Sequence, residues 1–209
     1  MAIGGLALGA AAYEPPKDAP KDSAAHKDHA KVTAKVGEKA PDFTLTDVDG
    51  KSWKLSDATK AGKIVVLEWY NPDCPVIVAH HKDAKTFNEL HTNYSSKGVM
   101  VVAINSSAEG KQGFGKERNA ESRKEYGIEY PILLDAEGAV GHMYGAKTTP
   151  HVYIVNKDGV LAYAGAIDNQ KKDGKVNYAK AALDELLAGK AVTTAETKPY
   201  GCGVKYSSK

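Results

Sequence analysis

Hydrophobic and polar positions alternate over residues 41–55 around an Asp49-Gly50 turn, which is the pattern of a β-hairpin. Residues 64–70 form a nearly continuous apolar run rich in β-branched and aromatic side chains, typical of a central strand buried on both faces. Apolar residues recur at helical spacing over 75–94, and residues 99–105 again have the pattern of a buried strand. This order predicts two parallel strands joined by a helical, right-handed crossover.

The rest of the chain continues to mix helices and strands, which predicts an α/β fold with a central mixed sheet flanked by helices and an N-terminal β-hairpin extension. We expect a polar helix over residues 116–126, a short strand over 130–134 and a helical turn over 137–144. An antiparallel hairpin with an Asn156–Gly159 turn should follow over 152–164, and an amphipathic helix over 177–187.

The composition of the chain limits its class. With 209 residues, 42% hydrophobic and 26% charged, it is long enough for one domain and excludes a collagen-like, coiled-coil or largely disordered protein. The net charge is +2 and the lysines are dispersed, so we expect no nucleic-acid partner. No apolar run approaches the roughly 20 residues of a membrane helix, so we expect no membrane span in the mature protein.

Three segments follow from this pattern: a leader and linker over residues 1–35, one domain over 36–189, and a C-terminal tail over 190–209 that carries Cys202. The first dozen residues are small and apolar and end in Gly9-Ala10-Ala11-Ala12, which resembles the end of a secretory signal peptide without its basic region. We therefore expect a periplasmic or otherwise exported protein.

Cys74 stands where the predicted central strand ends and the next helix begins, with Pro75 in the first helical turn. The helix dipole and free backbone N–H groups at such a position stabilise a thiolate and lower the thiol pKa below its free value of about 8.5. A carboxylate of Asp73 facing the sulfur would have the opposite effect. The alternative is that Cys74 is simply a small buried residue.

Several segments of the sequence, in matching order, resemble the thioredoxin-like redoxin group, which includes the alkyl hydroperoxide reductase/thiol-specific antioxidant family and the exported thiol-disulfide oxidoreductases. These segments are Leu67–Val76, Tyr144-Gly145, Thr148–Val155 and the turn Lys157-Asp158-Gly159. The resemblance covers roughly residues 36–189 and implies a thioredoxin-like fold and a redox-active cysteine at position 74.

The resemblance also implies roles for individual residues. Glu68 matches the acid that lies behind the active site and assists proton transfer; the alternative is a merely edge-exposed glutamate. Pro150, after Thr149, matches the cis-proline whose loop packs against the attacking sulfur and presents backbone to a partner chain. His151, next to it, is the candidate for tuning the Cys74 thiolate.

Two departures from the family pattern limit the reaction. Ile77 occupies the position of the second cysteine of a dithiol oxidoreductase, so Cys74 cannot form the usual local disulfide. Asn71 occupies the position of the threonine that a peroxiredoxin uses to polarise peroxide, and neither Arg118 nor Arg123 lies in a matching motif. Asn71 still has a hydrogen bond to donate, so both disulfide exchange and peroxide reduction stay open.

Cys202 is the candidate resolving thiol, at the end of a flexible arm over residues 197–201 and between two glycines. The alternatives are a structural bridge to Cys74, worth on the order of 4–5 kcal/mol in the chain-entropy model, and an unpaired thiol. Most of the seven histidines are expected to face solvent, and we expect no metal and no cofactor.

Together these patterns predict a thiol-dependent, antioxidant-type oxidoreductase that acts through Cys74, with Cys202 or an external thiol completing the cycle. Its partners are then a thiol or disulfide protein or a small peroxide, and an external thiol reductant. A hypothesis from another class is a binding module that holds a partner on the cis-proline face without turnover. The sequence does not predict the oligomeric state.

Overall fold

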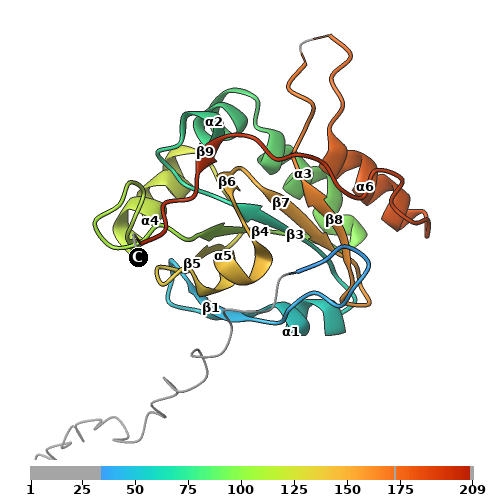
Figure 1. The fold of residues 1–209 in the computed structure, drawn as a ribbon, viewed down its shortest axis with the longest axis horizontal. Coiled ribbons are helices and arrows are strands. Elements are labelled where there is room, and N and C mark those ends of the chain that lie inside the picture. Colours follow the sequence, from blue (N-terminus) through green and yellow to red (C-terminus); the bar gives the residue numbers. More distant parts are fainter. Residues whose placement is uncertain (1–33, 172, 208–209) are drawn as a thin grey trace, which may run out of the picture.

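The computed structural model describes residues 34–171 and 173–207, so most of the expected leader and linker lies outside the described residues. A seven-stranded sheet in the order β2-β1-β5-β4-β3-β7-β8 forms the centre of the domain (Figure 1). These strands are β1 (Thr44–Asp47), β2 (Ser52–Lys54), β3 (Ile64–Trp69), β4 (Val99–Asn105), β5 (Ile132–Leu134), β7 (Val152–Val155) and β8 (Leu161–Gly165).

Strand β3 lies in the interior of the sheet, and its six residues are all buried. It runs parallel to β4 and antiparallel to β7, so both of its edges are paired. This confirms the predicted central strand and the parallel crossover from β3 to β4. The described chain therefore has the expected α/β architecture with a mixed sheet.

The hairpin β1–β2 extends the sheet at the edge opposite to β8, because β1 also pairs antiparallel with β5. Its turn contains Gly50 at φ 84°, a conformation that favours glycine. The N-terminal hairpin extension is thus confirmed. Helix α1 (Leu55–Lys60), directly after β2, was not expected, because the alternating pattern had placed Leu55 in the strand.

Helices cover both faces of the sheet (Figure 1). One face packs against α3 (Thr86–Tyr94), α6 (Tyr178–Leu187) and the end of α4 (Lys116–Glu125), and this layer of the core also contains Cys74. The other face packs against α1 and α5 (Ala139–Tyr144). Alternate residues of β3 serve the two layers, as expected for a strand covered on both sides.

The prediction of one helix over residues 75–94 is wrong. The segment is divided into α2 (Pro75–Val78), a π-helical turn η2 (Ala79–Asp83) and α3. Lys85, at φ 49°, is left-handed and separates η2 from α3. A π-helical turn holds an extra residue, which changes the direction of the side chains in it. In η2 this leaves the neighbouring residues His80 and His81 both buried.

The C-terminal segment folds back over the domain (Figure 1). Its strand β9 (Cys202–Gly203) pairs antiparallel with β6 (Thr148–Thr149) in a separate two-stranded sheet. The expected flexible arm over residues 197–201 is instead held in place, because the amide of Thr197 donates to the Ala164 carbonyl at 3.1 Å. We call residues 195–206 the C-terminal strap.

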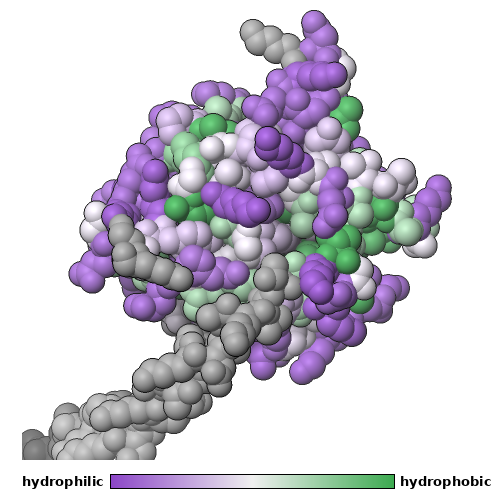
Figure 2. Space-filling view, viewed as in Figure 1, coloured by the Kyte–Doolittle hydropathy of each residue, from purple (hydrophilic) through white to green (hydrophobic). Residues whose placement is uncertain are grey.

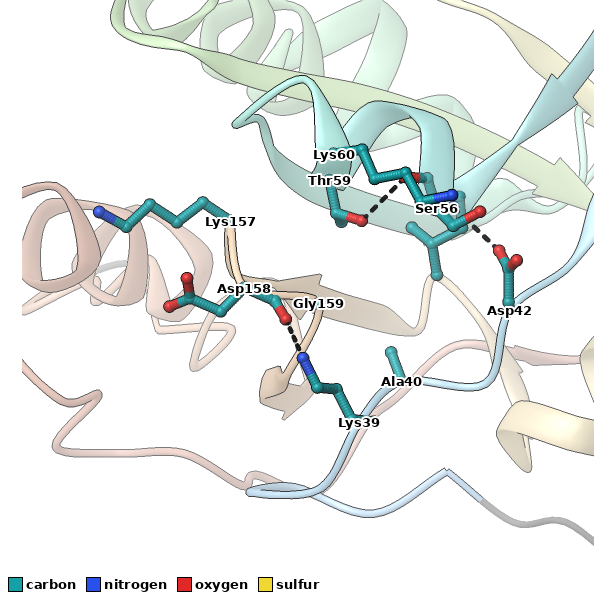
Figure 3. A pocket seen from close by; sticks show the side chains of 10 residues that line it. Lys39, Ala40, Asp42, Ser56, Thr59, Lys60, Lys157, Asp158 and Gly159 are labelled. Carbon is teal, nitrogen blue, oxygen red and sulfur yellow. Dashed lines mark hydrogen bonds between the residues drawn. The ribbon is translucent and has the colours of Figure 1, made fainter.

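The surface has two further features. The loop that projects between β8 and α6 is hydrophilic (Figure 2). A surface hollow lies beside the Lys157–Gly159 turn, where Lys39 donates to the Asp158 carbonyl and the Ser56 amide donates to Asp42 (Figure 3). Since β7 is antiparallel to β3, this turn lies at the start of β3, opposite to Cys74.

Candidate active site at the Thr149-Pro150 loop

Cys74 lies at the N-terminus of α2, five residues after the end of β3, and Pro75 occupies the first turn as expected. Its thiol donates to the carbonyl of Thr149 at 3.1 Å. The Thr149-Pro150 peptide bond is cis, which confirms the expected cis-proline. The side chain of Cys74 is fully buried, so the sulfur lies in the core beside this loop rather than open to solvent.

The strap brings Cys202 to the same place. Cys202 is opposite Thr149 in the β6–β9 pair, and its Sγ atom lies 2.6 Å from the Sγ atom of Cys74. Both cysteines are free thiols. A disulfide bond would require the sulfurs to approach to about 2.05 Å. The two sulfurs are therefore next to each other although 128 residues separate them.

The two thiols differ in acidity. Burial raises the pKa of Cys74, but hydrogen bonds from the Cys202 thiol and from the Ile77 backbone outweigh it and lower this pKa below the ordinary value. Burial and the neighbouring Cys74 raise the pKa of Cys202. As pH rises, Cys74 loses its proton first, and the Cys202 thiol, which is still protonated, donates a hydrogen bond to the resulting thiolate.

The carboxylate of Asp73 is paired with a cation, so it does not act on Cys74 as an isolated negative charge. Arg118 on α4 donates to the Oδ1 atom of Asp73 from Nε at 2.8 Å and from a second nitrogen at 2.7 Å. The guanidinium group neutralises the charge that the sequence places next to Cys74. The sequence did not reveal this role of Arg118, because Arg118 lies 45 residues after Asp73 along the chain and in no recognisable motif.

Asn71 shapes the loop before Cys74. Its side-chain oxygen accepts from the Asp73 amide at 2.9 Å, while its amide group donates to the carbonyl of Gln112 at 3.0 Å and to Ser107 Oγ at 3.4 Å. Both of its N–H groups are thus already used within the protein. The hydrogen bond that the sequence left available for a substrate is committed to the 107–113 loop.

Glu68 is fully buried, so the alternative of an edge-exposed glutamate is wrong. Its carboxylate lies 2.7 Å from His81 Nε2, also fully buried, and accepts a longer hydrogen bond of 3.3 Å from Tyr130. The His81 ring stacks on Phe87, which shares the core layer of Cys74. A buried carboxylate requires such partners, but their positions in sequence gave no signal of the pairing.

The expectation that most histidines face solvent is wrong for His80, His81 and His151, which are all buried. The His151 ring lies 3.1 Å from the Tyr153 hydroxyl and 3.4 Å from the Lys147 amide, and burial lowers its pKa to about 4. Within the described chain, none of its hydrogen bonds reaches Cys74. Its ring packs against Tyr153, whose side chain belongs to the opposite core layer.

Two further searches concern the described residues only. In residues 34–171 and 173–207, no group of three or more histidine, cysteine or acidic side chains is arranged to hold a metal ion. Over the same residues, every helix is too short or too polar to cross a membrane.

Comparison with known proteins identifies the family of this chain. The Redoxin family model matches residues 35–183. The thiol-disulfide oxidoreductase ResA of Geobacillus thermodenitrificans is 30% identical over 129 residues, which cover 62% of this chain and 68% of the relative. ResA of Bacillus subtilis is 29% identical over 129 residues, covering 62% of this chain and 66% of the relative.

Solved structures show the same architecture. The hypothetical protein SMc02350 of Sinorhizobium meliloti superimposes with a TM-score of 0.74 at 29% identity, covering 85% of this chain and 97% of that one. A putative thiol:disulfide interchange protein DsbE of Chlorobium tepidum gives a TM-score of 0.53 at 26% identity, covering 63% and 85%. These comparisons do not favour a non-catalytic binding module. The chain belongs to the Redoxin family and is a thiol-dependent oxidoreductase with a thioredoxin-like fold.

Proposed function

We propose that the protein catalyses thiol–disulfide exchange, with Cys74 as the attacking thiol and Cys202 as the resolving thiol. The observation that carries this proposal is the 2.6 Å separation of the two sulfurs beside the Thr149-Pro150 loop. The order of ionisation supports the assignment, because the thiol with the lowered pKa is the better nucleophile at neutral pH. Two relatives named thiol-disulfide oxidoreductase point to the same chemistry.

The proposed reaction has two exchanges. The Cys74 thiolate attacks one sulfur of a substrate disulfide, a mixed disulfide forms, and the other substrate sulfur leaves as a thiolate that takes up a proton. The Cys202 thiolate then attacks Cys74, the mixed disulfide breaks, and the second substrate thiol leaves. The substrate disulfide gains two electrons, and the protein ends with a Cys74–Cys202 disulfide that an external thiol reductant must reduce.

Glu68 supplies the proposed proton acceptor. It lies on β3 on the face that carries Val66 and Tyr70, which belong to the same core layer as Cys74. The partner His81 lies on η2, directly after the helix that Cys74 begins. The pair can therefore hold a proton on the side of the sheet that carries Cys74 while the thiolates exchange.

Disulfide exchange is favoured over peroxide reduction by the use of Asn71. A peroxidase site needs a free hydrogen-bond donor to polarise the O–O bond, and the amide group of Asn71 is occupied by Gln112 and Ser107. The substrate is accordingly a protein or peptide disulfide, docked on the Thr149-Pro150 loop once β9 gives way. We place this reaction in an exported, periplasmic setting, on the basis of the leader-like first dozen residues.

Trapping tests the proposal. Reduced protein is mixed with a peptide disulfide and analysed by non-reducing mass spectrometry. The wild type should end with a Cys74–Cys202 disulfide, whereas Cys202→Ser should accumulate a mixed disulfide between Cys74 and the peptide. Cys74→Ser should form neither product. A peptide adduct on Cys202 in the wild type would contradict the assignment, and oxidation of Cys74 by hydrogen peroxide far faster than by the peptide would indicate a peroxidase.

A further inference from the structure

The Tyr200 side chain, two residues before Cys202, joins three parts of the chain that are distant in sequence. Its hydroxyl lies 2.6 Å from Asp168 Oδ1, in the loop after β8, and 2.8 Å from His80 Nε2, in η2. On the far side of the imidazole ring, His80 Nδ1 lies 3.1 Å from Thr86 Oγ1. We call Tyr200, His80 and Asp168 the strap latch.

The hydrogen atoms of the strap latch can be assigned from what each group is able to donate. An ionised carboxylate only accepts, so the single hydroxyl hydrogen of Tyr200 goes to Asp168. His80 Nε2–H must then donate to the Tyr200 oxygen, and Nδ1 accepts from Thr86. Hydrogen bonds lower the pKa of Asp168 despite its burial, and burial lowers that of His80, which agrees with an ionised carboxylate and a neutral ring.

Between the strap latch and Cys202 stands a residue that lets the strap lie close to the cis-proline loop. Gly201 adopts φ 124°, and a Cβ atom there would lie 2.2 Å from the carbonyl oxygen of Thr149. Any larger residue would push the strap away from Cys74. The strap is thus fixed at Tyr200, pressed against Thr149 at Gly201, and paired with β6 at Cys202.

We propose that Tyr200 is a positioning residue for the resolving step, held by His80 and Asp168 so that Cys202 stays within reach of the Cys74 sulfur. This proposal rests on the proposed role of Cys202. A thiol tethered in this way reacts at a high effective concentration, and loss of the tether lowers that concentration without changing either sulfur. His80 thereby has a different partner from its neighbour His81, which pairs with Glu68.

The experiment separates attack from resolution in one reaction. Reduced protein reacts with one equivalent of 5,5′-dithiobis(2-nitrobenzoic acid). The Cys74 thiolate releases one thionitrobenzoate and carries the other as a mixed disulfide, and the Cys202 thiolate displaces the second as the Cys74–Cys202 disulfide forms. Absorbance follows the two releases as a first and a second phase, and mass spectrometry identifies the adduct between them.

Above the alkylation midpoint of Cys74, where Cys74 is a thiolate in every variant, Tyr200→Phe should leave the first phase at least as fast as in the wild type. It should slow the second phase about tenfold or more, because it removes the hydrogen bond to the charged Asp168, which alone corresponds to about that factor, together with the one from His80. His80→Ala should slow the second phase by less, because the hydrogen bond from Tyr200 to Asp168 remains, while His80→Gln, whose amide nitrogen can replace Nε2, should recover most of the rate. The matched control is Tyr94→Phe, which removes a tyrosine hydrogen bond to Asp184, 2.5 Å long, away from the strap. It should leave the ratio of the two phases unchanged.

The outcomes distinguish this inference from the proposed function. If the second phase persists in Cys202→Ser, the resolving role itself is wrong. If the second phase disappears in Cys202→Ser but keeps its wild-type rate in both Tyr200→Phe and His80→Ala, the resolving role survives and the positioning role is refuted. Equal slowing of both phases would also refute it, since that is the signature of a general structural loss. Thermal unfolding confirms that each variant is folded, and His80→Ala decides the question if Tyr200→Phe is not.

Discussion

The two cysteines that meet at the active site are supported by different kinds of structure. Cys74 follows the central strand of a seven-stranded sheet and is enclosed in the core layer that α3 and α6 complete. Cys202 lies half-buried in a two-residue strand near the end of the chain, paired with β6 alone. The Cys74 sulfur is therefore fixed by the whole domain, whereas we expect the Cys202 sulfur to separate without unfolding of the core.

The largest effect should come from the buried Glu68–His81 pair. Replacing Glu68 with alanine leaves both His81 and Tyr130 without their shared buried hydrogen-bond partner, and each buried polar group left unsatisfied costs about 1–3 kcal/mol of unfolding free energy. Urea denaturation followed by circular dichroism measures the loss. Activity should fall as well, because the proposed proton acceptor is removed.

The control for Glu68→Ala is Glu125→Ala. Glu125 also accepts from a basic side chain, Lys82 at 3.1 Å, but their side chains are 44% and 56% exposed. Its removal should cost at most about 1 kcal/mol. If the two variants lose the same stability, burial of the Glu68–His81 pair does not stabilise the core layer that contains Cys74.

The next effect concerns the strap. Gly165 in β8 faces Thr197, and a Cβ atom there would lie 2.5 Å from the Thr197 backbone oxygen and 2.8 Å from its nitrogen. Gly165→Ala should therefore displace the strap, at about 1–3 kcal/mol for an overpacked contact. Hydrogen exchange should become faster at the Thr197 and Val204 amides, which donate to Ala164 and Lys147, while β3 amides stay protected.

Gly203→Ala provides the matched control, since a Cβ atom at Gly203 meets nothing within 4 Å although the residue belongs to β9. Exchange in the strap should then match that of the wild type. If Gly165→Ala instead accelerates exchange in β3, the strap and the core unfold together, and the contrast between the two cysteines is lost.

This contrast also explains what the sequence could predict. Strands such as β3 and β4 owe their place to long apolar runs, and the Asp49-Gly50 turn specifies the β1–β2 hairpin, so local pattern was sufficient for the fold. The cis Thr149-Pro150 bond was expected from the resemblance alone. Nothing local shows that His80 contacts Tyr200, because that contact spans 120 residues and depends on the extra residue of a π-helical turn.

Asn71 illustrates the same limit at the site. Its position three residues before Cys74 suggested a hydrogen bond free to donate to a substrate, but the 107–113 loop, which has no regular pattern, occupies its amide group. The pairing of Asp73 with Arg118 was equally hidden, because the sequence of the polar helix α4 does not show which carboxylate an arginine on it contacts. Sequence thus located the sulfurs but not the groups that adjust them.

A smaller effect tests how Cys202 acts on Cys74 before any exchange. Cys202→Ala removes the thiol that donates to the Cys74 sulfur, so the pKa of Cys74 should rise. The rate of Cys74 alkylation by iodoacetamide, followed by mass spectrometry over a pH series, gives the midpoint. Because the thiolate is the reacting form, the midpoint should move to higher pH in Cys202→Ala and stay in place in Gly203→Ala. An unchanged midpoint in Cys202→Ala would show that the lowered pKa has another source.

The smallest effect distinguishes the charge of Asp73 beside Cys74 from the net charge of α4. Arg118→Gln leaves the Asp73 carboxylate unneutralised beside Cys74, so the alkylation midpoint should move slightly to higher pH, because a negative neighbour disfavours the thiolate. The partners are about 30% exposed, so the unfolding free energy should change by less than about 1 kcal/mol. Arg123→Gln removes the same charge from the same helix, but Arg123 pairs with Asp49 in the hairpin turn. A shift in Arg118→Gln with none in Arg123→Gln assigns the effect to Asp73, whereas equal shifts would assign it to the net charge of α4 and leave Asp73 without a part in setting the Cys74 pKa.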